Sequence, residues 1–108
     1  MVMKAKPYKF ENNKYIPCEK SEATHVLLKL PGPLQRRMLP IRPEANPHWT
    51  WNGDLNKPTL KPSILSTTYN GDIKIRCHSF VTDGQVKFLT DSTHEFAGQT
   101  LDLLDVDL

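Results

Sequence analysis

The 108-residue sequence has no long apolar run and only two cysteines, Cys18 and Cys77. A transmembrane helix needs about 18 or more consecutive apolar residues, so we expect no membrane contact. The opening residues, Met1 to Lys6, lack the apolar core of a secretory signal. Two cysteines so far apart do not indicate a disulfide framework, and reduced thiols are typical of the cytoplasm. These absences predict a cytoplasmic protein.

The sequence also lacks helical periodicity, glycine-rich loops, and prolines after residue 62. No window free of Pro and Gly places apolar residues at the helical spacing i, i+3, i+4, i+7. No phosphate-binding Gly-rich loop and no nucleophile elbow is present. All nine prolines lie at or before Pro62, which predicts loops in the first half and regular sheet in the second. We predict one mostly β domain over residues 1–108, either a small antiparallel sandwich or a partly open barrel.

Acidic residues are scarce in the first part of the chain. Residues 1–42 hold nine basic and three acidic residues, whereas residues 43–108 hold five basic and nine acidic residues. The basic part can face nucleic acid or an acidic protein, or the two parts can attract each other within the fold. Residues 1–20 form a basic N-terminal segment with interleaved aromatics, a mixture that can stack on bases while holding phosphates. The basic surface candidates are Lys4, Lys6, Lys9, Lys14, Arg36 and Arg37.

Three short strands are predicted in the first half, over residues 6–10, 24–30 and 37–41. Pro7 and Pro17 cannot donate to a sheet ladder, so we expect the strand over 6–10 at a sheet edge. Ser21 is a candidate N-cap for one turn of helix. Pro31-Gly32-Pro33 predicts a turn between the second and third strands.

Two tryptophans, Trp49 and Trp51, alternate along the chain and should share one face of a strand. Together they supply a large apolar area, which fits either a core position or a platform on which a ligand stacks. Asn52-Gly53 follows directly, and this dipeptide favours a type I′ hairpin turn.

The clearest pattern is a three-stranded meander over about residues 63–91. Asn70-Gly71 and Asp83-Gly84 are hairpin signals, and the segments around them are β-rich and alternate apolar with polar residues. A last short strand is predicted over residues 100–104.

The register of the meander decides which side chains share a face. If both loops have two residues, Val81 faces Val86 and Ile64 faces Cys77. Cys77 then lies on the core face, whereas His78 points to the opposite face.

Metal-binding and nucleophilic side chains are few. A structural zinc site needs four Cys or His ligands, usually including a closely spaced pair, and the chain has no Cys-x-x-Cys. A site built from Cys77, His94 and either His25 or His48 stays open.

A cysteine nucleophile is the enzymatic alternative. Its thiolate needs an imidazole nearby, and Asp91 or Glu95 could orient the ring of His94 for Cys77. A core-facing cysteine is usually inert, which counts against this interpretation. Arg76 opposite Asp91 is most simply a cross-strand ion pair.

Four motifs occur in one order across roughly residues 24–104. They are Trp49-Thr-Trp-Asn-Gly-Asp54, Pro58-Thr-Leu-x-Pro-Ser-Ile64, Cys77-His-Ser-Phe-Val-x-Asp-Gly84 and Asp91-x-Thr-His-x-x-Ala-Gly-Gln-Thr100. In this order the chain resembles a small domain family of unknown function from bacteriophages and prophages, some of whose members carry an ammonia monooxygenase label. Nothing in the chain resembles a copper oxygenase.

The resemblance also implies a zinc site that this chain has lost. The family pattern has Cys-Pro-Gly-Cys-Gly-x-x-His in the first hairpin and Asp-Cys-Thr-His near the end, which together with the cysteine of Cys-His-Ser-Phe suggest zinc ligands. Here Leu30-Pro31-Gly32-Pro33, Arg37 and Ser92 stand at those positions. The resemblance therefore implies that Leu30, Pro33 and Leu34 fill the space beside Cys77, and we predict no bound metal and no cofactor.

The positions that still match the family are the candidates for binding a ligand or partner: Trp49, Trp51, Asn52, Asp54, His78, Asp83, Asp91 and His94. The phage resemblance and the lack of a closed catalytic set favour a phage or prophage accessory protein that binds a host protein, for example as an inhibitor of a defence system. An enzyme or small-ligand-binding domain that uses His78, Asp91 and His94 is one alternative. A nucleic-acid-binding protein is another, and exposed strand edges make a homodimer plausible.

Overall fold

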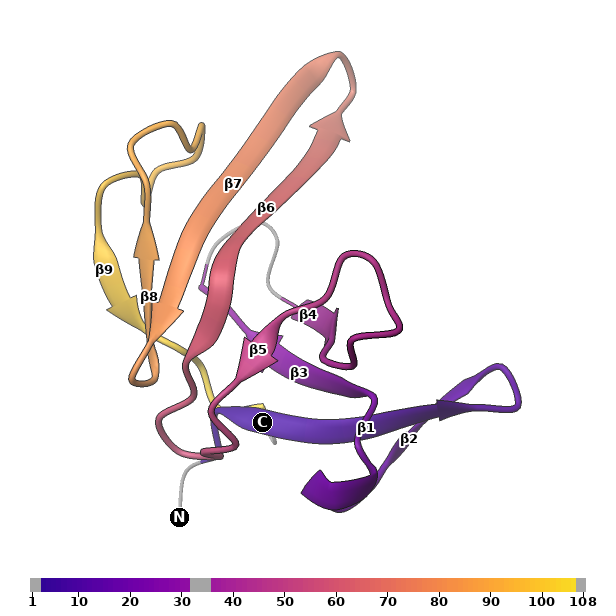
Figure 1. Cartoon of the computed structure of the whole chain (residues 1–108). Helices are drawn as coiled ribbons and strands as arrows, with labels where there is room; N and C mark the ends of the chain where they lie inside the picture. The colour runs from indigo at the N-terminus through magenta and orange to yellow at the C-terminus, as the bar shows by residue number, and fades with distance from the viewer. Residues whose placement is uncertain (1–2, 32–35, 107–108) are drawn as a thin grey trace.

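The computed structural model describes residues 3–31 and 36–106 and contains two antiparallel sheets (Figure 1). The four-stranded sheet has the order β2-β1-β3-β4, and the five-stranded sheet has the order β5-β6-β7-β8-β9. The strands are β1 (Ala5–Glu11), β2 (Lys14–Pro17), β3 (His25–Lys29), β4 (Arg36–Pro40), β5 (Thr50–Trp51), β6 (Leu60–Asn70), β7 (Ile73–Thr82), β8 (Gln85–Phe88) and β9 (Thr100–Asp102). The prediction of a mostly β, antiparallel fold is confirmed, and the described strands do not close into a barrel.

The first strand lies inside its sheet, which corrects the expectation of an edge strand. β1 pairs with β3 over Ala5–Tyr8 and with β2 only over Tyr8–Glu11. Pro7 therefore lies just outside the stretch that pairs with β2, and its missing N–H removes no bond from that ladder. A proline is compatible with an interior strand when the neighbouring strand is this short.

The connections in the first half differ from the sequence expectations in detail. Lys20–Glu22 is a single turn of 3-10 helix whose N-cap is Glu19, and no side chain caps it, so Ser21 is not the N-cap. The expected turn at Pro31-Gly32-Pro33 falls mostly outside the described residues. Asn52-Gly53 is not a hairpin turn, because β5 and β6 are joined by an eight-residue loop. In this loop Asn52 Oδ1 accepts hydrogen bonds from the backbone N–H groups of Asp54 and Thr59.

The predicted meander is present as β6, β7 and β8, and β5 and β9 extend the sheet on either side. Asp83 and Gly84 both have positive φ, of 50° and 78°, as a type I′ turn requires, and Val81 pairs with Val86 as expected. The other turn is Gly71-Asp72 rather than Asn70-Gly71, with Gly71 at φ 64°. Ile64 therefore pairs with Ser79 instead of Cys77.

This shift moves the β7 partner of each β6 residue by two positions. Because side chains alternate with a period of two, each side chain stays on the face that was predicted for it. Cys77 is 5% exposed and belongs to the core. Burial raises the pKa of its thiol, while Arg37 acts in the opposite direction. Cys77 is therefore a neutral, inert core residue, as its predicted orientation suggested. Both cysteines are free thiols.

The core contains side chains from both sheets, and Phe88 is its largest fully buried member. Its members are Ala5, Val26, Leu28, Leu30, Leu39, Leu60, Ile64, Cys77, Val81, Val86, Phe88 and Leu103. Because Ile64 and Ser66 of β6 and Cys77, Ser79 and Val81 of β7 face this core, the opposite face of the β6–β7 pair is left toward solvent.

Candidate active site

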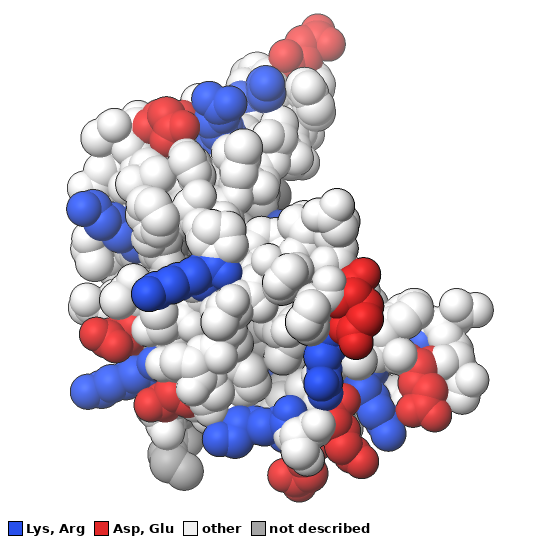
Figure 2. Space-filling view, in the orientation of Figure 1, with Lys and Arg blue, Asp and Glu red and all other residues white. Residues whose placement is uncertain are grey.

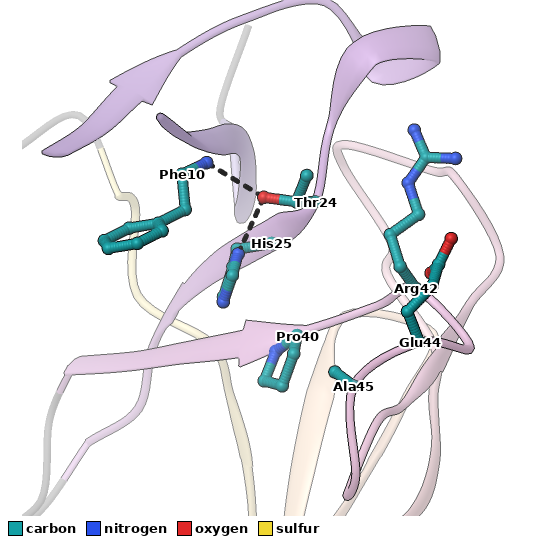
Figure 3. A pocket seen from close by; sticks show the side chains of 7 residues that line it. All are labelled: Phe10, Thr24, His25, Pro40, Arg42, Glu44 and Ala45. Carbon is teal, nitrogen blue, oxygen red and sulfur yellow. Dashed lines mark hydrogen bonds between the residues drawn. The ribbon is translucent and has the colours of Figure 1, made fainter. Parts of the chain in front are cut away.

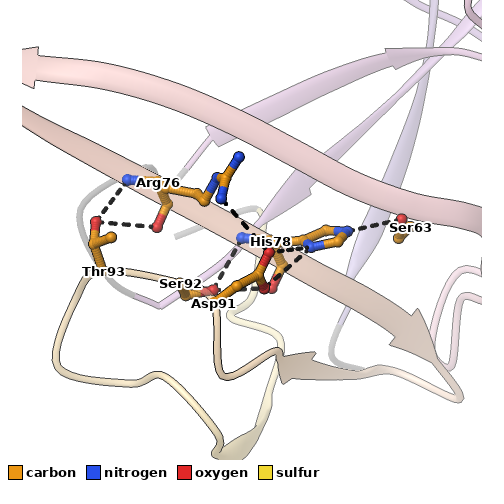
Figure 4. Close-up of polar contacts among 6 residues, drawn as sticks. All are labelled: Ser63, Arg76, His78, Asp91, Ser92 and Thr93. Carbon is orange, nitrogen blue, oxygen red and sulfur yellow. Dashed lines mark hydrogen bonds and ion pairs between the residues drawn. The ribbon is translucent and has the colours of Figure 1, made fainter.

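Three polar side chains from separate segments meet on the solvent-facing side of β6 and β7. His78 Nε2 lies 3.1 Å from Ser63 Oγ, and His78 Nδ1 lies 3.0 Å from Asp91 Oδ2 and 3.2 Å from Asp91 Oδ1. Figure 4 shows the imidazole between the carboxylate and the hydroxyl. Ser63 belongs to β6, His78 to β7 and Asp91 to the loop after β8.

The chemistry of the partners fixes the proton positions. A carboxylate only accepts hydrogen bonds, so the N–H of a neutral His78 is on Nδ1 and donates to Asp91. Nε2 is then a lone-pair acceptor, and the Ser63 hydroxyl donates to it. A hydroxyl that donates to an imidazole held by a carboxylate is the arrangement of a Ser-His-Asp nucleophile.

A break in the β6–β7 pairing places Ser63. Leu60 pairs with Val81 and Ile64 pairs with Ser79, so three residues of β6 stand opposite one residue of β7 between these pairs. The extra residues bulge out of the ladder, and a bulge of this kind re-aims nearby side chains. Ser63 is the last residue of the bulge, directly after the cis bond Lys61-Pro62.

The loop after β8 is fixed to β7 by hydroxyl groups. Ser92 Oγ accepts the N–H of His78 at 3.0 Å and donates to the carbonyl of His78 at 3.0 Å. Thr93 Oγ1 accepts the N–H of Arg76, and the N–H of Thr93 donates to the carbonyl of Arg76. These contacts hold Asp91 beside the imidazole, although β8 itself ends at Phe88.

The hydrogen bond from His78 is the main reason that the pKa of Asp91 lies below its usual range, and the charge of Arg76 adds to the effect. Asp91 therefore stays ionised at neutral pH. The expected pair between Arg76 and Asp91 is present, but its distance of 3.9 Å is longer than the contact between Asp91 and His78. The His78 side chain is 25% exposed, so a substrate can reach it.

Sequence reasoning selected His78 and Asp91 but missed Ser63. A lone serine carries no spacing signal, and the resemblance assigns no chemistry to the motif that contains it, Pro58 to Ile64. The signal that could have identified Ser63 is its place in that motif, combined with His78 and Asp91 in the two motifs that follow.

His94, which was grouped with His78 and Asp91, packs elsewhere. Its ring meets Phe88 edge-on at 4.7 Å between centroids, and its Nδ1 accepts the N–H of Phe96 at 3.2 Å. Its Nε2 is buried and has no partner among the described residues. Burial lowers the pKa of His94, with a small opposing effect of Glu95. These contacts are those of a structural residue.

We expect folding stability to fall as the pH drops below about 6.5, the pKa of an unfolded histidine. Burial lowers the folded pKa of His94, so the unfolded chain binds the proton more readily. The stability contribution is complete above the unfolded pKa and is lost toward the lower folded pKa. Urea unfolding between pH 7 and pH 5 measures this slope, which His94→Gln should reduce.

His25 provides the control for this measurement. Burial lowers its pKa as well, so it keeps part of the slope in the single variant. The double variant His25→Gln/His94→Gln should lose both parts. An unchanged slope in the double variant would contradict the prediction.

The remaining ligand candidates have local structural contacts. Trp49 and Trp51 pack against the core, and their indole N–H groups donate to the carbonyls of Ser63 and Asp54, each at 3.3 Å. Asp54 Oδ1 accepts the N–H groups of Asn56 and Lys57, which lower the pKa of Asp54. Asn52 and Asp54 therefore shape the loop between β5 and β6.

The basic candidates lie on or next to β1, β2 and β4 of the four-stranded sheet, and several of them have local partners. Lys4 donates to the carbonyl of Leu103, Lys9 pairs with Glu11, and Arg37 is half-buried on β4. Lys6 lies over the ring of Tyr8, and Lys14 and Arg36 are exposed. On the face drawn in Figure 2, basic and acidic side chains are interspersed.

A further hollow lies on the other sheet, away from the triad. It has a volume of about 550 Å³ and is lined by Phe10, Thr24, His25, Pro40, Arg42, Glu44 and Ala45 (Figure 3). Thr24 Oγ1 accepts the N–H of Phe10 and bonds His25 Nδ1 at 2.8 Å, so these three polar groups are paired with one another. None of its lining residues belongs to the Ser63–His78–Asp91 cluster.

Within residues 3–31 and 36–106, no three His, Cys, Asp or Glu residues are arranged to hold a metal ion. Leu30 is buried in the core, whereas Pro33 and Leu34, which were expected beside Cys77, lie outside the described residues. Ser92, which the resemblance aligns with a cysteine, accepts the N–H of His78 through its Oγ. Across the same described ranges, no helix is long and apolar enough to cross a bilayer.

One family model matches the chain, over residues 2–89, and it is described as bacterial ubiquitination-like system serine protease (BubE). Ser63 and His78 lie within the matched range, and Asp91 lies just beyond its end. No curated protein and no solved structure matches the chain.

The family match overturns the prediction of a phage or prophage accessory protein directed against a host defence system. The description is that of a serine protease, and it does not address binding of nucleic acid or a homodimer, which stay predictions. A component of a ubiquitination-like system acts on proteins, which agrees with the expected protein partner but not with a viral host target.

Proposed function

This chain belongs to the BubE family of bacterial ubiquitination-like system serine proteases, and we propose that it hydrolyses peptide bonds with Ser63 as the nucleophile. The observation that carries the proposal is the contact of 3.1 Å between Ser63 Oγ and Nε2 of His78. Asp91 supports it, because its carboxylate holds the proton of His78 on the opposite ring nitrogen.

The reaction has two halves. Ser63 Oγ attacks the carbonyl carbon of the substrate as His78 Nε2 takes the hydroxyl proton. The bond between carbon and nitrogen then breaks, His78 returns the proton to the leaving amine, and an acyl ester remains on Ser63. Water attacks this ester with His78 again as the base, which releases the acid and restores the hydroxyl.

The third residue has a positioning function. Asp91 keeps His78 in the tautomer that can accept the proton of Ser63, and its negative charge stabilises the imidazolium that forms. Its lowered pKa keeps it ionised through this cycle. Partners of the family's system, a ubiquitination-like pathway, are the expected source of the protein substrate.

A fluorophosphonate probe tests the nucleophile without a known substrate. An activated serine displaces fluoride from phosphorus and keeps the phosphonyl group, whereas an ordinary serine does not react at this rate. We expect mass spectrometry to find the label on Ser63 of the full chain. His78→Gln should abolish labelling.

The matched control is His48→Gln, because His48 is an exposed histidine whose Nδ1 contacts the carbonyl of Ala45. This variant should label at the wild-type rate. No label on Ser63, or labelling that survives His78→Gln, would contradict the proposal.

A further inference from the structure

The edge of β6 next to Ser63 is open on the side away from β7. β5 pairs with β6 only at Leu60 and Lys61, whereas β6 continues to Asn70. In Figure 1 the β6–β7 hairpin extends well beyond β5. An unpaired edge of this kind presents a row of backbone donors and acceptors.

The register identifies which backbone groups point outward. Opposed residues in an antiparallel pair either bond each other or both point away. Arg76 and His78 of β7 bond through their N–H and carbonyl groups to the loop 89–93, on the side away from β6. Their partners Thr67 and Leu65 must therefore direct their own N–H and carbonyl groups away from β7.

The alternation continues along the strand. Tyr69, which pairs with Lys74, points outward like Thr67 and Leu65, and the described residues supply no partner to these outward groups. At the other end, the carbonyl of Ser63 is bonded by the indole of Trp49. The open edge therefore begins at the nucleophile and runs toward the tip of the hairpin.

Two large apolar side chains flank Thr67 along this edge, on the face of the triad. Leu65 is 51% exposed and Tyr69 is 66% exposed, and both project from the same face as Ser63 because they lie two and six residues away. A strand of about six residues that pairs with this edge would place every second side chain over Leu65 and Tyr69.

We propose that the substrate of this enzyme is an extended, unfolded peptide segment that adds to the β6 edge as a further strand, with apolar side chains at alternate positions. The proposal rests on the proposed function. The open edge starts at Ser63, so a peptide bound along it as a strand would reach the nucleophile, and this favours a substrate over other partners. A second copy of this chain paired at the same edge would cover the nucleophile. β5 and Trp49 block the edge beyond Ser63, so the paired part of the substrate lies on one side of the scissile bond.

The outward N–H of Thr67 provides a sharp test. Thr67→Pro removes this donor and places the proline ring at the open edge, without removing a bond of the β6–β7 ladder. Thr67→Ala is the matched control, because it loses the same side chain and keeps the N–H. Hydrolysis of a mixture of quenched-fluorescent decapeptides by the full-length chain gives kcat/KM.

We expect Thr67→Pro to lower kcat/KM about tenfold or more, which corresponds to the loss of a backbone hydrogen bond and of close strand approach. Thr67→Ala should stay near the wild-type value. Both variants should keep the wild-type rate of fluorophosphonate labelling on Ser63, which separates this test from that of the nucleophile. Equal kcat/KM in the two variants, or normal labelling with no decapeptide cleaved by the wild-type chain, would overturn the proposal.

Backbone methylation of the peptide gives a second, independent measurement. Two sets of peptides carry N-methyl groups, one at odd and one at even positions. One set should no longer be cleaved and the other should be cleaved normally, because only every second residue of an added strand directs its N–H toward β6. A methylation effect without this period of two would contradict strand addition. A dimer seen by sedimentation that Thr67→Pro dissociates, with unchanged hydrolysis, would assign the edge to a second copy instead.

Discussion

Replacing Ser63 with alanine should reduce peptide hydrolysis by a factor on the order of 10⁶ while the chain stays folded. The hydroxyl forms the bond to the substrate carbonyl, and no other described serine contacts His78 Nε2. The decapeptide mixture used for the wild type measures the loss. Circular dichroism and the urea midpoint should be close to those of the wild type, because Ser63 is only partly buried and its hydroxyl bonds His78 on the protein surface.

The double variant Ser63→Ala/His78→Ala tests whether the two residues act together in one catalytic step or contribute to the rate independently. Residues that act in one step are strongly non-additive, so the double variant should be about as inactive as Ser63→Ala alone. Thr68→Ala, a partly buried hydroxyl residue on the same strand, is the control and should remain active. A Ser63→Ala enzyme that retained substantial hydrolysis would show that the nucleophile lies elsewhere.

Asp91→Asn should lower kcat by a factor on the order of 10⁴ with little change in KM. The amide can donate to Nδ1 of His78, which favours the tautomer with its proton on Nε2. That nitrogen then cannot accept the proton of Ser63, although the shape of the site is unchanged. Steady-state kinetics on one cleaved decapeptide separate kcat from KM.

The control for this substitution is Asp72→Asn, the same chemical change at the exposed hairpin tip. It should leave both constants near the wild-type values. Imidazole chemistry supplies a further readout, since ¹⁵N NMR of His78 should report the proton on Nδ1 in the wild type and its transfer toward Nε2 in Asp91→Asn. A fall in activity without any change of tautomer would assign Asp91 a purely structural contribution.

The turn signals determined much of the second sheet. Asp83-Gly84 specified a type I′ turn and the pairing of Val81 with Val86, because few residues tolerate positive φ at both positions. Gly71 can be the second residue of a turn at Asn70-Gly71 or the first residue of one at Gly71-Asp72. The structure has the latter, so Ile64 pairs with Ser79, two residues beyond the predicted partner Cys77. The faces were unaffected, because strand side chains alternate with a period of two.

The position of Pro7 shows a limit of local patterning. A proline indicates a strand edge only if the neighbouring strand is long enough to need its N–H, and the length of β2 is not visible from Pro7 itself. The misplacement of His94 has a similar origin. Its closeness in sequence to Asp91 suggested one cluster, but the loop turns it toward Phe88 instead.

Ser63, His78 and Asp91 show what each level contributed. The sequence by itself determined the β6–β7–β8 meander, the turn at Asp83-Gly84 and the opposite orientation of Cys77 and His78, since these follow from local conformational preference and the alternation of side chains. Only the tertiary structure decided that a bulge in β6 brings Ser63 to His78, and that Ser92 and Thr93 hold Asp91 on the far side of the ring. The physical reason is that a bulge and a loop held by hydroxyl groups depend on partners distant in the chain, which no local pattern records.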